Sequence, residues 1–416
     1  MKILSVVGAR PNFVKIAPLM AEMRKHAAMR PLLVHTGQHY DLEMSDSFFQ
    51  DLGIPQPDIN LGVGSASAAC QIGQIMERLE PVLLAERPDI VVLVGDVNST
   101  VAGALTAVKL GIRVAHVEAG LRSFDRTMPE EINRVVTDAI SDLLFVSEPS
   151  GVENLLKEGR PASQIFLVGN VMIDTLMNCL ARARQLEPLA IPEIWGENYS
   201  ERCYSERTPP LNPLDGRGGQ QGAPERPRCR ELSEESPQCT RFALVTLHRP
   251  ATVDNASVLR IIWQALKEIG KEIQMLFPVH PRTRKRLQEL GLELSESGPL
   301  ARPNGVRLIS PLSYVRFLRL ESLATFVVTD SGGIQEETTV LGVPCLTVRE
   351  NTERPITITE GTNTLVGLDP ERLKEEARQI LCGKGKQGRA PSLWDGQAAR
   401  RIVDILAEQL PAGNPD

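Results

Sequence analysis

Short apolar runs alternate with longer segments of helical periodicity along the first 120 residues of the chain. The apolar runs are rich in β-branched residues and occupy residues 2–8, 32–37, 89–96 and 112–120. Helical patterns follow from about Val14, near residues 68–86 and from Thr100. This alternation predicts a parallel sheet with helices on both of its faces.

The same alternation returns after residue 240. Apolar runs occupy residues 242–248, 274–280, 306–310, 325–333 and 344–349. Helical patterns lie near residues 256–270, up to about Ser322 and up to Leu341. A last amphipathic segment, residues 397–410, carries Ile402, Ile405 and Leu406 on one face and predicts a terminal packing helix.

We therefore predict an α/β fold with two Rossmann-like domains that face each other across a cleft. Residues 1–169 form the first domain and residues 170–375 the second. An insertion at about 184–240 is rich in Pro, Gly, Arg and Glu without an apolar period, so we expect it to be flexible. Residues 376–416 form a C-terminal segment whose helix returns to the first domain.

The charge balance and the apolar segments narrow the classes of partner and location. The 416 residues have a formal net charge of −6, so no basic excess is present to neutralise a nucleic acid. No apolar stretch approaches the ~20 residues that span a bilayer. The N-terminal apolar run is interrupted at Gly8 and Arg10, before it reaches the length of the apolar core of a signal peptide. We expect a cytoplasmic protein with no membrane or nucleic-acid partner.

Neither the cysteines nor the histidines form a metal-binding pattern. The seven cysteines are widely spread and include no CxxC pair, so the sequence predicts neither a disulfide framework nor a zinc site. The six histidines include no HxxxH or HxH. Residues 383–388 match GxGxxG, but they follow a helical pattern instead of a strand, which argues against dinucleotide binding. We expect neither a metal nor a cofactor.

Two loops have the features of anion-binding sites. In GARPNFVK, Gly8 permits a tight turn, Pro11 suits the first position of a helix, and Arg10 and Lys15 add positive charge. The alternative is an ordinary strand-to-helix loop that carries two surface cations.

The second such loop is TDSGGIQEE. It places Ser331, Gly332 and Gly333 between an apolar strand and a helix, where hydroxyl and amide donors converge on a diphosphate. Glu336 and Glu337 follow in the helix, where they could accept hydrogen bonds from ribose hydroxyls. The alternative is a helix cap followed by acids that favour a helix.

Carboxylates end two of the predicted strands in the first domain. Asp96 and Glu118 close apolar runs, and Glu130 and Glu131 follow Pro129 at the start of a helix. Ligands bind at the carboxyl edge of such sheets, so these acids are expected to face one pocket, where their repulsion raises at least one pKa. Helix capping for Asp96 and first-turn stabilisation for the two glutamates are the alternatives.

Four of the histidines also lie at strand ends, namely His39, His116, His248 and His280. A single histidine in such a place is more often structural. The pairs His248-Arg249 and His280-Pro281-Arg282 end apolar strands of the second domain, and the arginine beside each histidine favours anion binding.

Taken together, these motifs resemble the non-hydrolysing UDP-N-acetylglucosamine 2-epimerases, a family with the two-domain glycosyltransferase-B fold. The motifs that carry the resemblance are GARPNFVK (8–15), HTGQHYD (35–41), GDVNST (95–100), HVEAGLRS (116–123), MPEEINR (128–134), VGNVMIDT (168–175), LHRPATVDN (247–255), FPVHPRTR (277–284), TDSGGIQEE (329–337) and TERP (352–355). The resemblance covers nearly the whole chain outside the insertion.

The resemblance implies an isomerase that interconverts UDP-GlcNAc and UDP-ManNAc through a glycal, with carboxylates in the first domain and UDP in the second. The implied catalytic residues are Asp96, Glu118, Glu130 and His248. The implied substrate-binding residues are Arg10, Lys15, Gln38, Arg122, His280, Ser331, Gly332, Gly333, Glu337 and Arg354. The family further implies a homodimer.

Three other functions stay open at this point. Asn12 stands where the commonest family sequence has Glu, and HTGQHYD and GARP also resemble relatives that act on UDP-2,3-diacetamido sugars. A glycosyltransferase of the same fold would share the nucleotide site but transfer the sugar to an acceptor. A non-catalytic nucleotide-sugar sensor would need the binding half alone, and would leave the clustered acids without a role.

Overall fold

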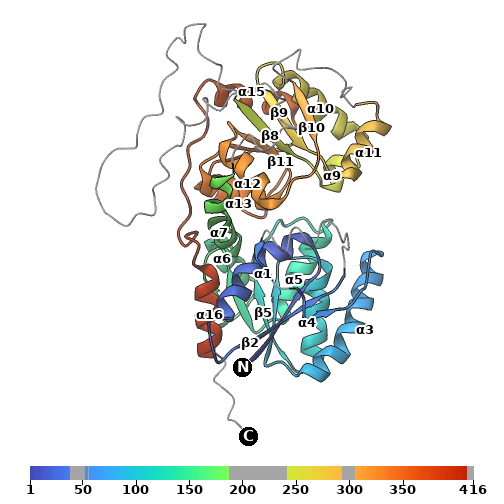
Figure 1. The fold of residues 1–416 in the computed structure, drawn as a ribbon, viewed down its shortest axis with the longest axis vertical. Helices are drawn as coiled ribbons and strands as arrows, with labels where there is room; N and C mark the ends of the chain where they lie inside the picture. The colour runs from blue at the N-terminus through green and yellow to red at the C-terminus, as the bar shows by residue number, and fades with distance from the viewer. Residues whose placement is uncertain (38–51, 55, 187–240, 293–304, 410–416) are drawn as a thin grey trace, which may run out of the picture.

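The structure is a computed structural model that describes residues 1–37, 52–54, 56–186, 241–292 and 305–409. Within these residues, two parallel sheets, each covered by helices, lie one above the other in Figure 1. The predicted α/β class with two such units is confirmed. The insertion predicted at 184–240 lies outside the described residues from 187 onward, and so do Gln38 and His39.

The first sheet has seven strands within the described residues, in the order β3-β2-β1-β4-β5-β6-β7, and all its pairs are parallel. The strands are β1 (Lys2–Val7), β2 (Arg30–His35), β3 (Ile59–Asn60), β4 (Ile90–Val94), β5 (Arg113–Val117), β6 (Leu143–Val146) and β7 (Ile165–Leu167). Every residue of β4 is buried, because helices cover both faces of the sheet. The four apolar runs expected here correspond to β1, β2, β4 and β5.

Helices connect these strands. They are α1 (Arg10–Met23), α3 (Ala68–Glu86), α4 (Asn98–Lys109), α5 (Pro129–Ile140), α6 (Pro149–Lys157) and the 3₁₀ helix η1 (Ala162–Gln164). The expected start of the first helix at Val14 is wrong by four residues. Pro11 lies in the first turn, and the Asn12 side chain accepts the Ala9 N–H at 3.2 Å, so the helix can begin directly after β1.

The second sheet has six strands within the described residues, in the order β10-β9-β8-β11-β12-β13, again parallel. The strands are β8 (Phe242–Thr246), β9 (Gln274–Pro278), β10 (Val306–Ile309), β11 (Val327–Thr329), β12 (Cys345–Thr347) and β13 (Asn363–Leu365). The helices are α9 (Pro250–Val253), α10 (Ala256–Ile269), α11 (Pro281–Glu289), α12 (Tyr314–Leu323), α13 (Gly332–Leu341), α14 (Ile356–Thr359) and α15 (Pro370–Leu381).

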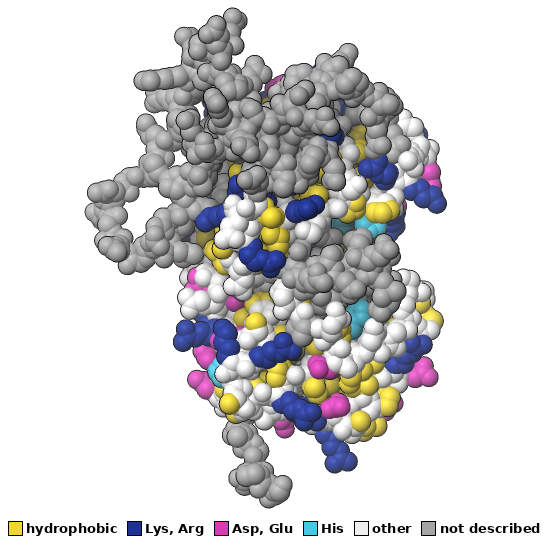
Figure 2. Space-filling view, in the orientation of Figure 1, with side chains coloured by type: hydrophobic (Ala, Val, Ile, Leu, Met, Phe, Trp, Pro, Cys, Tyr) yellow, Lys and Arg dark blue, Asp and Glu magenta, His cyan; other side chains and the backbone are white. Residues whose placement is uncertain are grey.

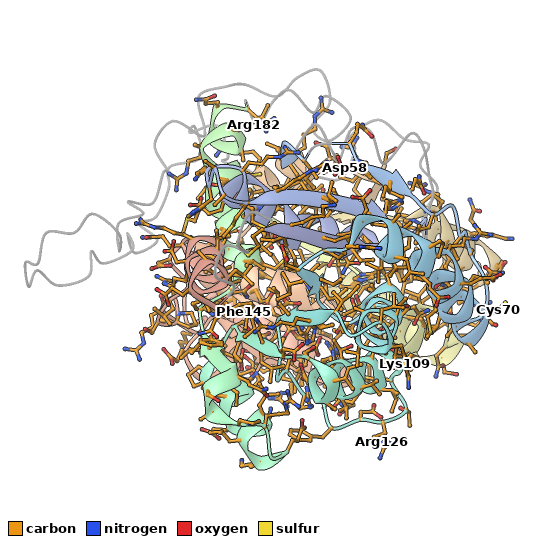
Figure 3. All side chains as sticks on the ribbon, turned by 90° about the horizontal axis from the view of Figure 1, so that it is seen from below. Asp58, Cys70, Lys109, Arg126, Phe145 and Arg182 are labelled. Atoms are coloured by element: carbon orange, nitrogen blue, oxygen red, sulfur yellow. The ribbon has the colours of Figure 1, made fainter. Side chains whose placement is uncertain are left out.

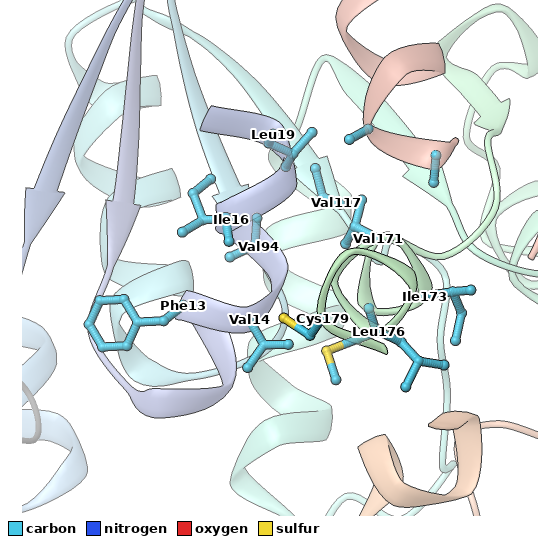
Figure 4. Close-up of a cluster of buried hydrophobic side chains, with 14 of the residues drawn as sticks. Phe13, Val14, Ile16, Leu19, Val94, Val117, Val171, Ile173, Leu176 and Cys179 are labelled. Atoms are coloured by element: carbon cyan, nitrogen blue, oxygen red, sulfur yellow. The ribbon is translucent and has the colours of Figure 1, made fainter. Parts of the chain in front are cut away.

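Helix α7 (Val171–Gln185) joins the two units. It packs against α1 on one side and against α12 and α13 on the other. Figure 4 shows Val14 and Leu19 of α1 near Val171 and Leu176 of α7, and these side chains belong to one buried cluster that also includes Leu341 of α13. A continuous apolar contact therefore runs from one sheet to the other.

The C-terminal helix α16 (Ala398–Gln409) lies beside the first sheet, against α1 and α7 (Figure 1). It agrees with the terminal packing helix expected at residues 397–410. The carboxylate of Asp174 in α7 accepts the N–H groups of Ala398 and Ala399 at 3.1 and 2.8 Å, and so caps the first turn of α16. Trp394 donates its indole N–H to the Ser147 carbonyl at 3.0 Å.

Charged side chains of both signs are interspersed over the lower half of the face shown in Figure 2. Seen from below in Figure 3, Phe145 lies near the middle of the view, whereas Cys70 and Arg126 lie at its edge. Among the described helices, none is both long enough and apolar enough to cross a membrane.

Candidate functional site

Two of the predicted acids stand at the tips of neighbouring strands. Asp96 follows β4 and Glu118 follows β5, and these strands pair directly. Glu118 has a φ of +71°, in the left-handed region that costs a non-glycine residue about 1–3 kcal/mol. A Cβ added to Gly95 would stand 2.9 Å from Nζ of Lys15 and 3.4 Å from Oε2 of Glu118. The absent side chain at Gly95 thus leaves room for both charges.

Glu118 forms an ion pair with Lys15, which reaches it from α1. The Glu118 and Lys15 side chains are 3% and 7% exposed. Asn12, in the first turn of the same helix, donates its side-chain N–H to the Val94 carbonyl at 2.6 Å and so fixes the helix start to β4. Burying two charges is expensive and gives little net stability, so this pair is better explained by a role in the site than by folding.

Asp96 is paired with Arg134 of α5 at 2.5 Å. Its side chain is 25% exposed, which leaves the carboxylate open to a ligand. Burial opposes ionisation of Asp96, but the charges of Arg134, Lys15 and Arg354 outweigh this cost and lower its pKa. Asp96 is therefore ionised at neutral pH.

The two glutamates at the start of α5 have different surroundings. Glu131 is buried and accepts the N–H groups of Ser123 and Phe124 at 2.9 and 3.0 Å, and it pairs with Arg134 at 2.7 Å. Glu130 is half-buried, and among the described residues it makes no hydrogen bond or ion pair. Glu131 orients Arg134 toward Asp96, whereas the carboxylate of Glu130 is free to meet a ligand.

The glycine motif of the second unit forms the N-terminus of α13. Ser331 is the N-cap residue, and its own N–H donates to Thr329 Oγ1 at 2.9 Å. Gly332 and Gly333 supply the first amides of the helix, which can bind an anion. A Cβ on Gly332 would stand 2.5 Å from Nη1 of Arg354, so the arginine packs directly against this helix start.

Arg354 is buried and lies among three carboxylates. Its distances are 2.5 Å to Glu336, 2.6 Å to Glu353 and 3.6 Å to Glu118. Glu118 belongs to the first unit and the other two acids to the second, so Arg354 joins the units by charge. Burial lowers the pKa of Arg354, but its acidic neighbours, led by Glu336 and Glu353, raise the pKa well above its usual value.

The pKa values of two acids beside Arg354, Glu336 and Glu353, are shifted in opposite directions. Burial raises the pKa of Glu336; Glu118 adds to this rise, while Arg354 and Lys15 oppose it. Burial likewise disfavours ionised Glu353, but Arg354, Arg349 and Arg249 hold its pKa well below the usual value. Arg349 and Arg249 contact Glu353 at 2.8 and 3.4 Å. One ionised carboxylate thus gathers three guanidinium groups near the start of α13.

His248 follows β8 and is half exposed, with its side chain 56% accessible. Its Nδ1 lies 3.2 Å from Asp330, which also accepts the backbone N–H groups of His248 and Arg249. Burial opposes ionisation of Asp330, but its hydrogen bond and charge contact with His248 lower its pKa. Asp330 therefore orients the His248 ring. His280 is the exposed N-cap residue of α11.

Other predicted substrate residues lie in networks of their own. The Tyr314 hydroxyl donates to Glu337 at 2.6 Å, deep in the second unit. Arg122 is buried against Asp138 and Glu158, at 2.7 Å from each. The side chain of Arg10 and all of Gln38 lie outside the described part of the chain. The predicted ligand contacts of these residues stay predictions.

The histidine at the end of β5 has a structural setting. His116 is fully buried, and its two ring nitrogens lie 2.6 Å from Asp138 and 2.8 Å from the Gly95 carbonyl. It fixes the backbone beside Asp96 without reaching the surface. His116 therefore has the structural role that a single histidine at a strand end more often has.

The sequence patterns did not predict several residues that the structure places in the site. Arg134 lies four residues after Glu130, one helical turn away, and Asp330 directly precedes Ser331. Glu353 precedes Arg354 in the TERP motif. Glu148 is the second residue after β6, as Asp96 is after β4, while Glu118 is the first residue after β5; the search for acids at strand ends could therefore have found it.

Sequence comparison identifies related proteins over almost the entire chain. The family model described as UDP-N-acetylglucosamine 2-epimerase matches residues 21–200 and 221–407. A UDP-N-acetylglucosamine 2-epimerase of Methanococcus maripaludis is 37% identical, covering 97% of this chain and 98% of that protein. A UDP-2,3-diacetamido-2,3-dideoxy-D-glucuronate 2-epimerase of Pseudomonas aeruginosa is also 37% identical, covering 98% of this chain and 100% of that protein.

Comparison with solved structures identifies the same family as comparison of sequences. The crystal structure of Methanocaldococcus jannaschii UDP-GlcNAc 2-epimerase in complex with UDP-GlcNAc and UDP matches with a TM-score of 0.79 and 37% identity, covering 98% of this chain and 100% of that one. A glycosyltransferase of kitacinnamycin, with a TM-score of 0.50 and 14% identity, shares the fold alone.

Proposed function

The chain belongs to the UDP-N-acetylglucosamine 2-epimerase family, and from this membership we propose that it inverts carbon 2 of the sugar in UDP-GlcNAc to give UDP-ManNAc. The observation that carries the proposal is the position of Glu118, which is bound to Lys15 of the first unit and lies 3.6 Å from Arg354 at the start of α13. Strand-tip acids and an anion-binding helix start thus meet at one place, as a reaction on a diphosphate-linked sugar requires.

The chemistry around C2 of the sugar determines the route of the reaction. The C2 proton of an acetamido sugar has no adjacent carbonyl to acidify it, so its direct removal at neutral pH is too slow. If the C1–O bond breaks as a carboxylate takes the C2 proton, the C–H electron pair forms the C1–C2 double bond and the C1–O pair leaves on the UDP oxygen. The products are a glycal and UDP, and re-addition with proton delivery to the opposite face of C2 inverts that centre.

Asp96, Glu118 and Glu130 differ in their exposure and in their charged partners, and this suggests a different role for each. Asp96 is ionised and one-quarter exposed, which suits proton transfer at C2. Glu118 is a buried carboxylate held in place by Lys15, and its negative charge suits the stabilisation of positive charge at C1. Glu130 is half-buried with a carboxylate free of described partners, so it is the candidate for the opposite face. His248, held by Asp330, would protonate or stabilise the departing diphosphate.

The diphosphate itself would bind in the second unit. The amides of Gly332 and Gly333, the Ser331 hydroxyl and the Arg354 guanidinium provide donors and positive charge. Lys15 adds a charge from the first unit. Holding UDP between elimination and re-addition requires this preorganised set, because a released UDP would leave the glycal as a product.

Isotope exchange tests the proposal. The protein is incubated with UDP-GlcNAc in deuterated water without any acceptor, and C2 is followed by NMR. We expect deuterium at C2 in both UDP-GlcNAc and UDP-ManNAc, with little free UDP. An unlabelled C2 would refute the epimerase and leave a glycosyltransferase or a sensor; steady accumulation of UDP would indicate a hydrolytic reaction instead.

A second candidate substrate is a UDP-2,3-diacetamido sugar. It is favoured by the Pseudomonas aeruginosa relative, which is as similar to this chain as the Methanococcus maripaludis one. The ratio of kcat/KM for the two substrates distinguishes them. We expect UDP-GlcNAc to be the better substrate, in line with the family model and the other relatives.

We further propose the organisation that surrounds this site. Residues 1–169 form an acid-bearing domain, residues 170–375 a UDP-binding domain, and the C-terminal segment returns to the first domain, where α16 packs on α1. The enzyme works in the cytoplasm as a homodimer. Sedimentation velocity checks the dimer, and a monomer at catalytic concentrations would refute it.

A further inference from the structure

Helix α5 buries the kind of side chain that a helix usually exposes. All the residues that it buries are polar: Glu131, Asn133, Arg134, Thr137 and Asp138. Ile132 and Val135, by contrast, are 37% and 40% exposed. A helix that covers a sheet normally turns its apolar stripe toward the core. The inward face of α5 is therefore built for contacts other than apolar packing.

This inward face contacts Asp96 at two points. Nη1 of Arg134 donates to the Asp96 carboxylate at 2.5 Å, and the side-chain amide of Asn133 donates to the Asp96 carbonyl at 2.9 Å. Helix α5 thus holds both the side chain and the backbone of the acid that stands at the tip of β4.

The Glu131 carboxylate joins this contact to a turn of the chain seven and eight residues earlier. Its Oε2 accepts from Nε and Nη2 of Arg134 at 3.1 and 2.7 Å and from the Ser123 N–H at 2.9 Å, and its Oε1 accepts the Phe124 N–H at 3.0 Å. A glutamate at the third position of a helix often bonds the N–H of the N-cap residue, here Met128. The oxygens of Glu131 are directed to the turn and to the arginine instead.

Two carboxylates share one guanidinium through separate nitrogen atoms. Glu131 occupies Nε and Nη2 of Arg134 and leaves Nη1 for Asp96. Glu131 and Arg134 are each 2% exposed, so solvent offers little alternative to these bonds. Because a guanidinium is a rigid planar fork, fixing two of its nitrogens fixes the direction of the third.

We propose that Glu131 is a positioning residue for Asp96: it holds Nε and Nη2 of Arg134 so that Nη1 stays on the carboxylate that takes the C2 proton, and it ties this contact to the Ser123–Phe124 turn. The inference rests on the proposed function, since that function makes Asp96 the base. Glu131 acts on Asp96 through Arg134, not by contact with the reacting atoms.

The direction of a pKa change separates positioning from a simple effect of charge. Burial raises the pKa of Asp96, and four charged groups also act on it: Arg134, Lys15 and Arg354, which lower the pKa, and Glu353, which raises it. If Glu131 keeps Arg134 in place, its loss raises the pKa of Asp96. If Glu131 were only a nearby negative charge, its loss would lower that pKa.

Two variants of Glu131 test the proposal. Glu131→Gln keeps the length, but its amide nitrogen cannot accept the N–H groups that converge on the carboxylate. Glu131→Asp keeps the charge, but it is too short to hold both the turn and the arginine. Both variants are expected to raise the pKa of Asp96 by about half a pH unit.

Two measurements report this shift. One is the acid limb of the kcat/KM profile. The other is an NMR titration of the Asp96 carboxyl in protein that carries ¹³C-labelled aspartate, with the signal assigned by its absence from Asp96→Asn. A downward shift in Glu131→Gln, or an unmoved Asp96 titration in either folded variant, would overturn the proposal.

Asp174 provides a matched control. It is a buried carboxylate that also accepts two distant backbone N–H groups, but these belong to α16. Asp174→Asn is expected to lower the melting temperature without moving the acid limb. A shift in Asp174→Asn as large as that in Glu131→Gln would show that the loss of any buried carboxylate has this effect, and the proposal would fail.

A double variant shows whether Arg134 is the intermediary. In an Arg134→Met background, Glu131→Gln is expected to move the Asp96 titration by less than about 0.2 pH unit, because the arginine through which it acts is gone. The full shift in that background would contradict the proposal. If the wild type does not exchange the C2 proton, the proposed function fails instead, while the NMR titration still decides whether Glu131 keeps Arg134 on Asp96.

Discussion

Nη2 of Arg354 lies 3.6 Å from Oε1 of Glu118, and this pair connects the turn before α14 to the tip of β5. One residue belongs to the anion-binding unit and the other to the acid-bearing unit. Lys15 completes the contact from α1. If UDP binds at Arg354 as proposed, a change in the way it is held is transmitted directly to the Glu118 carboxylate.

Gly332→Ala is expected to weaken UDP binding about tenfold. The new Cβ would stand 2.5 Å from Nη1 of Arg354 and 2.9 Å from Glu353, and Arg354 is too firmly held by its carboxylates to move without loss. Gly333→Ala is the matched control, because its nearest atom is Met172 Cε at 3.3 Å. Calorimetry with UDP compares them; equal affinities in the two variants would contradict the predicted place of the diphosphate.

Arg134→Met is expected to move the acid limb of the kcat/KM profile upward by about one pH unit. Arg134 is the strongest of the charges that lower the pKa of Asp96, so its removal raises that pKa and the ionised base is lost at a higher pH. Activity then falls most on the acid side of the optimum. The exposed Arg126→Met serves as control. An unmoved limb in Arg134→Met would mean that Asp96 is not the titrating base.

Asp330→Asn is expected to lower kcat roughly tenfold or more while changing KM little. The substitution removes the negative charge that contacts Nδ1 of His248 at 3.2 Å but keeps an oxygen for the backbone N–H groups of His248 and Arg249. Steady-state kinetics checks the split. Asp369→Asn, at the exposed cap of α15, is the control. A loss confined to KM would assign His248 to ground-state binding instead.

Asp174 makes stability depend on pH. Its folded pKa is raised from 3.8 to about 6, chiefly by burial, so the folded state binds more protons than the unfolded chain between these values. The stabilisation is therefore complete below the unfolded pKa and is lost as pH rises through about 6. Relative to Asp174→Asn, the wild type is expected to lose about 1.4 kcal/mol of unfolding free energy per pH unit in that window.

Urea unfolding at several pH values between those two pKa values measures this difference. Asn cannot titrate, so its curve lacks the contribution of this site, although the variant is less stable because one backbone N–H loses its acceptor. Parallel pH dependences in the two proteins would show that Asp174 titrates normally in the fold.

The fold was largely predictable from local pattern. The apolar runs at residues 89–96 and 112–120 became β4 and β5, because a parallel strand buried on both faces must be continuously apolar. The short edge strands β3 and β7 carry too few residues for such a run, so they went unpredicted. Helix α1 began earlier than periodicity suggested, because its start is fixed by Pro11 and by the side chain of Asn12, not by an apolar face.

The sequence by itself determined which residues stand at strand tips and helix starts, since period and turn chemistry act over a few neighbours: Asp96, Glu118, Ser331 and His248 were found in this way. Only the tertiary structure decided which charges meet. Lys15 and Glu118, Arg134 and Asp96, and Arg354 and Glu118 are paired across the fold. Such pairs depend on the packing of strands and helices far apart in the chain, which no local pattern records.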